Sequence, residues 1–495
     1  MANGQAEGWW PLAKQVLGRR DFWADASTVW VYFWMGVGSL GWDVLSEKAV
    51  FPRMFLPEVV HLITYAQVAC TGGLMWANQR VTRSTLGKVL VALNVYGVWL
   101  HLKRLRTALN SGSAYQSALS SAGIKMKDPW NPMLLALLFP FKKFLPDIGA
   151  SKKLKRSTEA YAPLAEVDAP LLERWKKLTP GLKMLNTFMG RGRIAQWLSM
   201  DVVRLENTDE DAPRRPLRPV VMYIHGGGWT VGDKMFAAKS AIEYMVATHD
   251  FVACVINYRL SPDVRFPEHL IDCKRALLWL KANVEQFGGD PEQIFVAGES
   301  AGGHLCSLVA LTANNSAYDP PEAEQPCDTS VRGCVDIYGV HDILDSEQHH
   351  VVNEGLDLST LNGPGGLVLF MEGVVFDRSS DQHRQHFLDG SPSHIVDAMV
   401  ESADASSEDT LCPFLLVHGT DDTLAAFDDS QAFFGRLQQL RKAKNSSVKD
   451  IFVEVKGAEH GFGYVPSPRS VSLSLAMGAF VKHHSTVKAP SKAKI

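Results

Sequence analysis

The sequence has little that would indicate a disulfide-rich, metal-binding or nucleic-acid-binding protein. Its seven scattered cysteines include no C-x-x-C pair and no zinc-type spacing, so we expect mostly reduced, buried thiols. The formal net charge of −3 gives no indication of a nucleic acid partner. The N-terminus lacks the basic start and short apolar core of a secretory signal peptide. Histidines between residues 349 and 394 have no H-E-x-x-H spacing, so a surface loop or lid segment is favoured there over a metal site.

Long apolar runs dominate residues 1–148. They cover Thr28–Trp42, Val59–Trp76, Leu86–Leu102 and Met133–Leu145. Trp and Tyr near the run ends and basic residues between the runs, such as Lys103-Arg104, are typical of a membrane interface. Each run is a little short or carries polar residues compared with the roughly 20 apolar residues of a spanning helix. We expect a hydrophobic helical region that associates with an intracellular membrane, the endoplasmic reticulum if the source is eukaryotic. The alternative is a helical domain packed on the rest of the chain or on a partner subunit.

Residues 149–200 predict a linker followed by a lid or cap helix. The stretch Ser151–Arg156 is basic and prolines follow it, which indicates a solvated connection or a segment resting on anionic lipid. Residues Leu171–Gln196 have a helical pattern and are expected to contribute a lid near the active site.

From Asp201 onward, short β-branched runs alternate with helical stretches, as in a mostly parallel α/β sheet. Strands are expected at Val220–Ile224, Val252–Ile256, Ile294–Ala297, Cys334–Tyr338, Phe414–Val417 and Ile451–Val455. A helix is expected from His269 to Phe287, ended by Gly288-Gly289. This pattern predicts one catalytic domain over residues 201–485, with a cap-like insertion at about 340–397 and a flexible tail at 486–495.

The motif Gly298-Glu299-Ser300-Ala301-Gly302 directly follows the apolar run Ile294–Ala297. A strand that enters G-x-S-x-G and is followed by a helix is the pattern of a nucleophile elbow, in which a strained turn exposes the serine hydroxyl. The flanking glycines are needed because backbones approach closely there. The five-letter motif alone is a weak signal and depends on its partners elsewhere in the chain.

A glycine-rich stretch, His225-Gly226-Gly227-Gly228-Trp229, follows the first strand of the series. Consecutive glycines allow backbone N–H groups to approach an oxygen that becomes negative during acyl transfer, and the N–H of Ala301 adds a donor. A phosphate-binding loop is the rival interpretation, but G-x-x-x-x-G-K-[ST] does not occur.

Serine needs a base to become nucleophilic, and in this fold the chain order is serine, acid, histidine. The predicted strand Phe414–Val417 leads into a turn with two adjacent carboxylates, Asp421 and Asp422. After the last strand, His460 lies on a glycine-flanked loop from which it can reach Ser300. Cys306, close after Ser300, is interpreted as a buried helix residue rather than a second nucleophile, and His304 and His418 as packing or turn-shaping residues.

Together these stretches resemble the α/β-hydrolase esterases and lipases of the hormone-sensitive-lipase-like group, most closely its bacterial carboxylesterases. Further matching stretches are Asn257–Pro262 and Phe266–His269, and the likeness covers most of Pro219–Phe480. The resemblance implies that Ser300 is the nucleophile and His460 the base. It also implies that Gly227, Gly228 and Ala301 form the oxyanion hole, and that Asp422 is the acid, with Asp421 second. Relatives often carry hydrophobic N-terminal helices.

We therefore expect an α/β-hydrolase fold and a serine carboxylic-ester hydrolase that works through an acyl-enzyme. That mechanism needs no metal and no cofactor. The expected partner is a small ester with an apolar acyl group. Two alternatives remain open: an amidase or peptidase on the same triad, or a non-catalytic ligand-binding protein on a hydrolase scaffold.

Overall fold

The computed structural model describes residues 83–129, 154–170, 197–206, 216–343, 375–376, 383–404 and 409–485, apart from single positions inside these ranges. A few isolated residues between 67 and 79, and residues 173 and 177, are also described. The chain divides into two compact units, Met1–Thr107 and Ala108–Ile495. The second unit holds the sheet and every residue discussed as part of the site.

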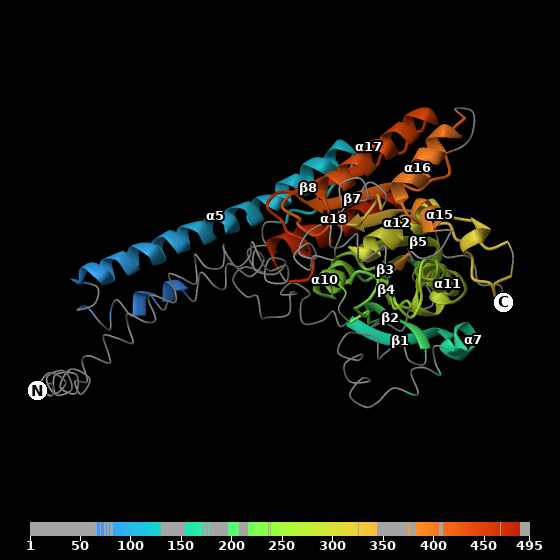
Figure 1. The fold of residues 1–495 in the computed structure, drawn as a ribbon, viewed down its shortest axis with the longest axis horizontal. Helices are drawn as coiled ribbons and strands as arrows, with labels where there is room; N and C mark the ends of the chain where they lie inside the picture. The colour runs from blue at the N-terminus through green and yellow to red at the C-terminus, as the bar shows by residue number, and fades with distance from the viewer. Residues whose placement is uncertain are drawn as a thin grey trace, which may run out of the picture. The chain divides into compact units, whose positions relative to one another are not determined.

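An eight-stranded sheet with the order β1-β2-β4-β3-β5-β6-β7-β8 forms the centre of the second unit (Figure 1). Its strands are β1 Leu154–Pro163, β2 Trp197–Leu205, β3 Arg218–Ile224, β4 Val252–Ile256, β5 Gly289–Glu299, β6 Cys334–Ile337, β7 Phe414–Gly419 and β8 Ile451–Val455. The last six in this spatial series pair in parallel, while β1 and β2 add two antiparallel pairings at one edge. All six strands expected from the sequence are confirmed.

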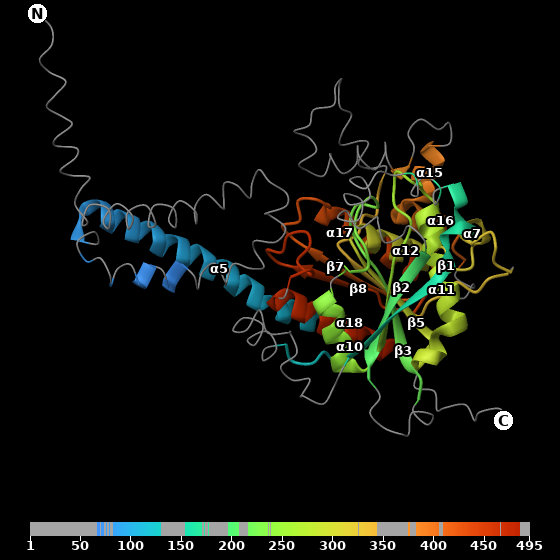
Figure 2. The same cartoon turned by 90° about the horizontal axis from the view of Figure 1, so that it is seen from below.

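Helices cover both faces of the sheet, as the two views in Figures 1 and 2 show. On one face pack α11 Glu268–Asn283, α12 Ala301–Leu311, α16 Pro392–Glu401 and α17 Phe427–Ala443. On the other pack α10 Lys239–His249, α18 Pro468–His484 and the end of α5 Thr85–Ser121. Alternate residues of β3 enter opposite cores: Met222 joins the first cluster and Tyr223 the second. Burial on both faces explains why these parallel strands are continuously apolar.

The remaining elements are short. They are α7 Leu164–Val167, the 3-10 segments η3 Val284–Phe287 and η4 Ser316–Tyr318, and α15 His383–Asp389. The helix expected from His269 to Phe287 is α11 followed by η3, and Gly288 ends it in the left-handed conformation with φ 77°. Only glycine adopts that conformation without a steric cost, so the sequence stop is a backbone requirement.

The α5 helix is 37 residues long and includes the apolar run Leu86–Leu102. Its basic tract, Lys103–Arg106, continues the helix instead of forming a loop, because Lys, Leu and Arg are good helix formers and the helix contains no proline. Within the part of the chain that the structure describes, α5 is the one helix long and apolar enough to cross a membrane. The runs at Thr28–Trp42 and Met133–Leu145, and most of Val59–Trp76, lie outside the described residues.

One part of the expected domain division is wrong. Residues Leu154–Pro163, expected to be linker, form the edge strand β1, and the sheet therefore begins before Asp201. The sequence is polar there because an edge strand exposes one of its faces. Arg156 and Thr158 use that polarity to contact the Asp201 carboxylate at 3.4 and 2.8 Å. The lid helix at Leu171–Gln196 and most of the insertion at 340–397 lie outside the described residues.

Candidate active site

Ser300 occupies a sharp turn between β5 and α12. Its backbone has φ 55° and ψ −123°, a conformation that is strained for a residue with a side chain. The strain is held by surrounding structure: the Ser300 N–H donates to Ile337 O at 2.9 Å. A β-carbon at Gly298 would lie 2.1 Å from Gly302 O, and one at Gly302 would lie 2.1 Å from Ile224 O. Both flanking glycines of the motif are thus required by close backbone approach.

Ser300, His460 and Asp422 come together at the carboxyl ends of three parallel strands. His460 Nε2 lies 2.9 Å from Ser300 Oγ, and His460 Nδ1 lies 2.7 Å from Asp422 Oδ2. Both are hydrogen-bond distances, as expected between a nucleophile, its base and the acid that orients the base. The neighbouring carboxylate, Asp421, is exposed and contacts the Thr420 hydroxyl instead. The geometry therefore selects Asp422 as the partner of His460.

Asp422 is held in one orientation by its own turn. The N–H groups of Leu424 and Ala425 both donate to Asp422 Oδ1 at 2.9 Å, while Oδ2 faces His460 and His418. Burial alone raises the pKa of this carboxyl, but the charge of His460 and hydrogen bonds from His418 and His460 outweigh it. The pKa of Asp422 consequently lies well below its ordinary value, and the group is ionised at neutral pH.

The glycine-rich loop after β3 lies directly against Ser300. A β-carbon at Gly226 would lie 3.1 Å from Ser300 Cβ. Gly227 and Gly228 have φ of 118° and 56°, and Gly227 O accepts hydrogen bonds from Thr230 and Val231 in a tight turn. Ala301 is the first residue of α12, so its N–H has no partner within the helix. Gly227, Gly228 and Ala301 thus lie in the two backbone turns next to Ser300, where the sequence leads us to expect an oxyanion hole.

Residues outside these motifs fix the glycine loop in place. The Trp229 indole donates to His304 Nδ1 at 3.2 Å, and His304 Nε2 donates to Gly390 O at 2.6 Å. Burial lowers the pKa of His304 to about 4, so this bridge is neutral. The loop after β4 supports the same stretch, since Tyr258 stacks on His225 with ring centroids 4.6 Å apart. His304 therefore packs as the sequence indicated, while the contact of Tyr258 had no sequence signal.

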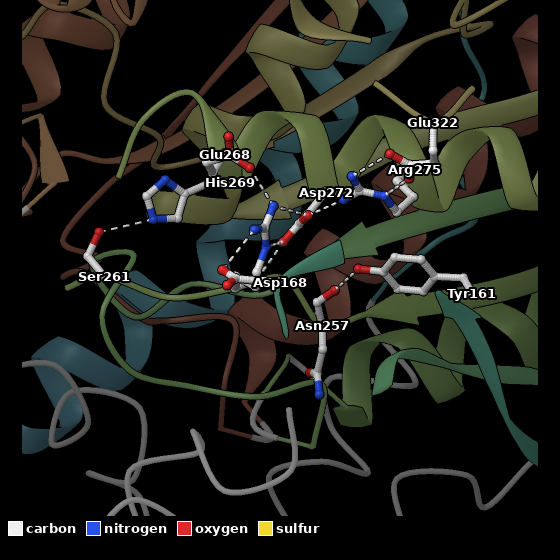
Figure 3. A network of polar contacts seen from close by, with 10 residues as sticks. Tyr161, Asp168, Asn257, Ser261, Glu268, His269, Asp272, Arg275 and Glu322 are labelled. Atoms are coloured by element: carbon white, nitrogen blue, oxygen red, sulfur yellow. Dashed lines mark hydrogen bonds and ion pairs between the residues drawn. The ribbon is translucent and has the colours of Figure 1, made fainter. Parts of the chain in front are cut away.

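The loop after β4 is itself anchored by Arg259, whose partners Asp168, Glu268 and Asp272 are labelled in Figure 3. The Arg259 guanidinium lies 2.8 Å from Asp272 Oδ2, 2.5 Å from Glu268 Oε2 and 3.3 Å from Asp168 Oδ2. Burial alone lowers the pKa of Arg259, but Asp272 and Glu268 outweigh that effect and raise it. Arg275 continues the network to Glu322. A cavity of about 610 Å³ borders these side chains, and neither Ser300 nor His460 lines it. The network has a structural role behind the glycine loop.

Glu299, the variable residue of the G-x-S-x-G motif, is fully buried directly before Ser300, and its contacts had no sequence signal. Its carboxylate accepts hydrogen bonds from Tyr223 at 2.8 Å and from Tyr338 at 3.4 Å. Burial raises the pKa of Glu299 to about 7, although hydrogen bonds from Tyr223 and Tyr464 act in the opposite direction. The tyrosines come from other elements, so these hydrogen bonds can be recognised only in the folded chain.

The remaining candidates can be placed briefly. The Cys306 thiol is buried and donates to Gly303 O at 3.0 Å, and desolvation raises its pKa well above the ordinary value. Cys306 is thus a packed helix residue, as expected. Within the described residues, no group of three or more His, Cys, Asp or Glu side chains could hold a metal ion.

Comparison with known proteins places these features in a family context. The family model described as BD-FAE matches residues 210–437. Esterase LipC of Mycobacterium tuberculosis is 33% identical over 272 residues, which cover 55% of this chain and 60% of LipC. The probable carboxylic ester hydrolase LipM of the same organism is 34% identical over 266 residues, which cover 53% of this chain and 54% of LipM. The resemblance to α/β-hydrolase carboxylesterases is confirmed.

The matched stretch spans a little over half the length of these two carboxylesterase relatives, so the activity and substrate of the whole chain do not follow from them alone. A solved fungal esterase from Rhizomucor miehei aligns with a TM-score of 0.45 at 18% identity, covering 74% of this chain and 88% of that chain.

Proposed function

We propose that this chain hydrolyses carboxylic esters, with Ser300 as nucleophile, His460 as general base and Asp422 as the acid that orients His460. The observation that carries the proposal is the continuous contact from Ser300 Oγ to His460 Nε2 at 2.9 Å and from His460 Nδ1 to Asp422 Oδ2 at 2.7 Å. The named carboxylesterase relatives support ester substrates.

In the first half-reaction, Ser300 Oγ attacks the ester carbonyl carbon while His460 Nε2 accepts the hydroxyl proton. The carbonyl oxygen becomes negative, and the backbone N–H groups of Gly227, Gly228 and Ala301 are the donors beside it. When the bond to the alcohol oxygen breaks, His460 returns the proton to that oxygen. The alcohol leaves and the acyl group remains on Ser300.

In the second half-reaction, water attacks the acyl-enzyme and His460 accepts its proton. The tetrahedral intermediate then collapses, Ser300 recovers its proton from His460, and the carboxylic acid leaves. Ionised Asp422 stabilises the imidazolium that forms in each half. Every step uses only this chain and water.

Labelling with a fluorophosphonate probe, combined with turnover of p-nitrophenyl esters of graded chain length, tests the proposal. Wild-type protein should label and turn over short or medium apolar esters, and Ser300→Ala should do neither. Cys306→Ala is the matched control, because this buried thiol has no role in the steps above. Labelling that survives Ser300→Ala would refute the assignment. Faster turnover of matched amides would instead indicate an amidase, and tight ligand binding without turnover a binding protein.

We also propose that the apolar part of α5 attaches the chain to a membrane. Exposed apolar side chains along it include Val89, Val95, Trp99 and Leu102, each at least half exposed. The basic tract Lys103–Arg106 follows them on the same helix and matches the charge of an anionic lipid surface. Along α5, apolar residues that could enter the lipid are thus followed by basic residues that could contact the lipid headgroups.

Vesicle flotation of the full chain tests this attachment. The wild-type protein should float with phosphatidylserine-containing vesicles, and a double substitution Val95→Glu, Trp99→Glu should reduce the bound fraction. Leu217→Glu is the matched control, since Leu217 is also an exposed apolar residue but precedes β3. Equal flotation of all three proteins would contradict attachment through α5.

A further inference from the structure

Polar side chains continue from Asp422 into the protein interior, on the side away from Ser300. Asp422 Oδ2 lies 3.2 Å from His418 Nε2, and His418 Nδ1 lies 2.6 Å from Ser430 Oγ. Ser430 Oγ in turn lies 3.3 Å from His341 Nδ1, and His341 Nε2 lies 2.9 Å from Asp336 Oδ2. All five side chains are buried. One unbroken series of contacts therefore joins Asp336 to the orienting acid.

Three separate elements supply this series. His418 belongs to β7, Ser430 to α17, and His341 to the loop after β6. The far end is held firmly, because Asp336 also accepts hydrogen bonds from Ser307 Oγ at 2.5 Å and from Gly339 N–H at 2.9 Å. Burying so many polar groups is unfavourable unless each is paired, so the arrangement is specific.

The heavy-atom positions determine which nitrogen of His418 carries a proton. His418 Nε2 faces two oxygens, Ala425 O at 3.1 Å and Asp422 Oδ2 at 3.2 Å, and neither can donate. Nε2 therefore carries a hydrogen and donates it. Ser430 Oγ lies between two ring nitrogens and has one hydrogen, which it donates to His418 Nδ1, so its oxygen accepts from His341 Nδ1.

The same reasoning makes His341 a cation. Its Nε2 faces the Asp336 carboxylate and its Nδ1 faces Ser430 Oγ as a donor, so both ring nitrogens carry hydrogen. Asp429 lies alongside, with Oδ2 3.6 Å from His341 Nδ1 and accepting from the His341 backbone N–H at 2.7 Å. Burial opposes the charge, but Asp336 and Asp429 outweigh it and raise the pKa of His341 to about 9.

We propose that His418, Ser430 and His341 form a positioning relay that points donors from a buried cation toward Asp422 and so tunes His460. The inference rests on the proposed role of Asp422. Every hydrogen bond runs in one direction, from His341 through Ser430 and His418 to Asp422. The relay makes the potential around the Asp422 carboxylate less negative, so His460 gives up its proton more readily. None of the three residues touches substrate in this scheme.

A purely structural role would give a different result from this electrostatic one. Loss of packing would lower stability without changing the pH at which His460 titrates. Loss of the relay would move the His460 titration to higher pH, because the imidazolium would face a more negative carboxylate. Two other titratable groups, Glu299 and Tyr338, face His460. The titratable groups around His341 are Asp336, Asp429 and His304. The test substitutions leave all five in place.

Nitrogen-15 NMR of histidine-labelled full-length protein tests the relay in the wild type and three variants. Ser430→Ala removes the central hydroxyl, and His341→Gln removes the cation while keeping a donor for Asp336. Ser474→Ala is the matched control, since Ser474 is also a buried helical serine but donates to Ser470 O in α18. We expect doubly protonated His341 and Nε2-protonated His418 at pH 7 in the wild type. We also expect the His460 titration to move to higher pH in both relay variants and not in the control.

Ester turnover supplies a second readout. In Ser430→Ala, the rising limb of the kcat–pH profile should move to higher pH together with the His460 titration while KM is unchanged, because only neutral His460 can accept the Ser300 proton. A neutral His341 at pH 7, or an unchanged His460 titration in Ser430→Ala, would overturn the relay, and this variant decides alone if His341→Gln does not fold. Because the titration needs no turnover, a failure of the proposed esterase activity is recognised separately, by Ser300→Ala.

Discussion

The Tyr223 hydroxyl donates a 2.8 Å hydrogen bond to the carboxylate of Glu299, the residue immediately before Ser300. Tyr338 contacts the same oxygen at 3.4 Å, and its ring lies 4.7 Å from that of His460. The buried Glu299 thus contacts Tyr223 of β3 and also Tyr338, whose ring packs beside His460.

Glu299 should make the stability of the protein depend on pH. Its pKa is raised from the ordinary value to about 7 by burial, so folding favours the protonated form. This contribution is fully present below the unfolded pKa and is lost as pH rises through about 7. In urea unfolding, Glu299→Gln should become more stable relative to wild type from pH 5 to pH 8, by up to about 3 kcal/mol.

The control is Glu285→Gln, which replaces an exposed glutamate in η3. It should differ from wild type by the same small amount at every pH. If the Glu299→Gln difference is also constant between pH 5 and pH 8, the buried-acid interpretation is wrong.

The two carboxylates after β7 should behave very differently. Asp422→Asn should lower kcat by about 10³- to 10⁴-fold, because the amide cannot stabilise the imidazolium and favours the wrong tautomer of His460. Asp421→Asn should remain within about threefold of wild type, since this exposed group contacts only its own turn, and such surface changes are usually small. Steady-state kinetics with one p-nitrophenyl ester compares them directly, and a greater loss in Asp421→Asn would reverse the assignment.

Two glycines offer a matched test of backbone requirement. Gly298→Ala should prevent folding or abolish activity, because its β-carbon would lie 2.1 Å from Gly302 O. Gly435→Ala, in the middle of α17 with nothing within 4 Å, should stabilise the protein by about 0.5–1 kcal/mol. Thermal unfolding and probe labelling measure both effects, and a well-folded, active Gly298→Ala protein would show that the elbow can relax.

The Arg259 network should contribute to stability more than surface ion pairs do. Asp272→Asn leaves the buried Arg259 without its fully buried carboxylate partner and should lower the free energy of unfolding by about 3–5 kcal/mol. Lys281→Gln breaks the pair with the largely exposed Asp328 and should cost at most about 1 kcal/mol. Denaturant titration separates the two, and equal effects would argue against a special role for the buried network.

Sequence alone predicted the parts of the fold that have a local signal. The six central strands are apolar on both faces, and the elbow and glycine loop have backbone requirements that only glycine meets, so each leaves a readable pattern. Chain order narrowed the partner of His460 to Asp421 or Asp422, the family resemblance favoured Asp422, and the 2.7 Å contact with His460 agrees with that choice.

The features that were missed depend on distant contacts. Strand β1 is polar because it lies at the edge of the sheet, and its amino-acid sequence therefore resembles that of a linker. Glu299 occupies a variable position of its motif, and its burial and hydrogen bonds depend on tyrosines from three other segments of the chain. His341 and Ser430 belong to no recognisable motif, and they come into contact only because the loop after β6 packs against α17.

The packing of Tyr115 and Leu119 has a practical consequence for protein production. Both residues lie near the end of α5 and are fully buried in the core on the α10 and α18 face of the sheet. An expression fragment that starts at Leu154 would keep all eight strands yet leave an unfilled depression on this face. A fragment that starts near Ala108 would keep Tyr115 and Leu119 but lack the exposed apolar half of α5. It should therefore be more soluble and less prone to aggregate.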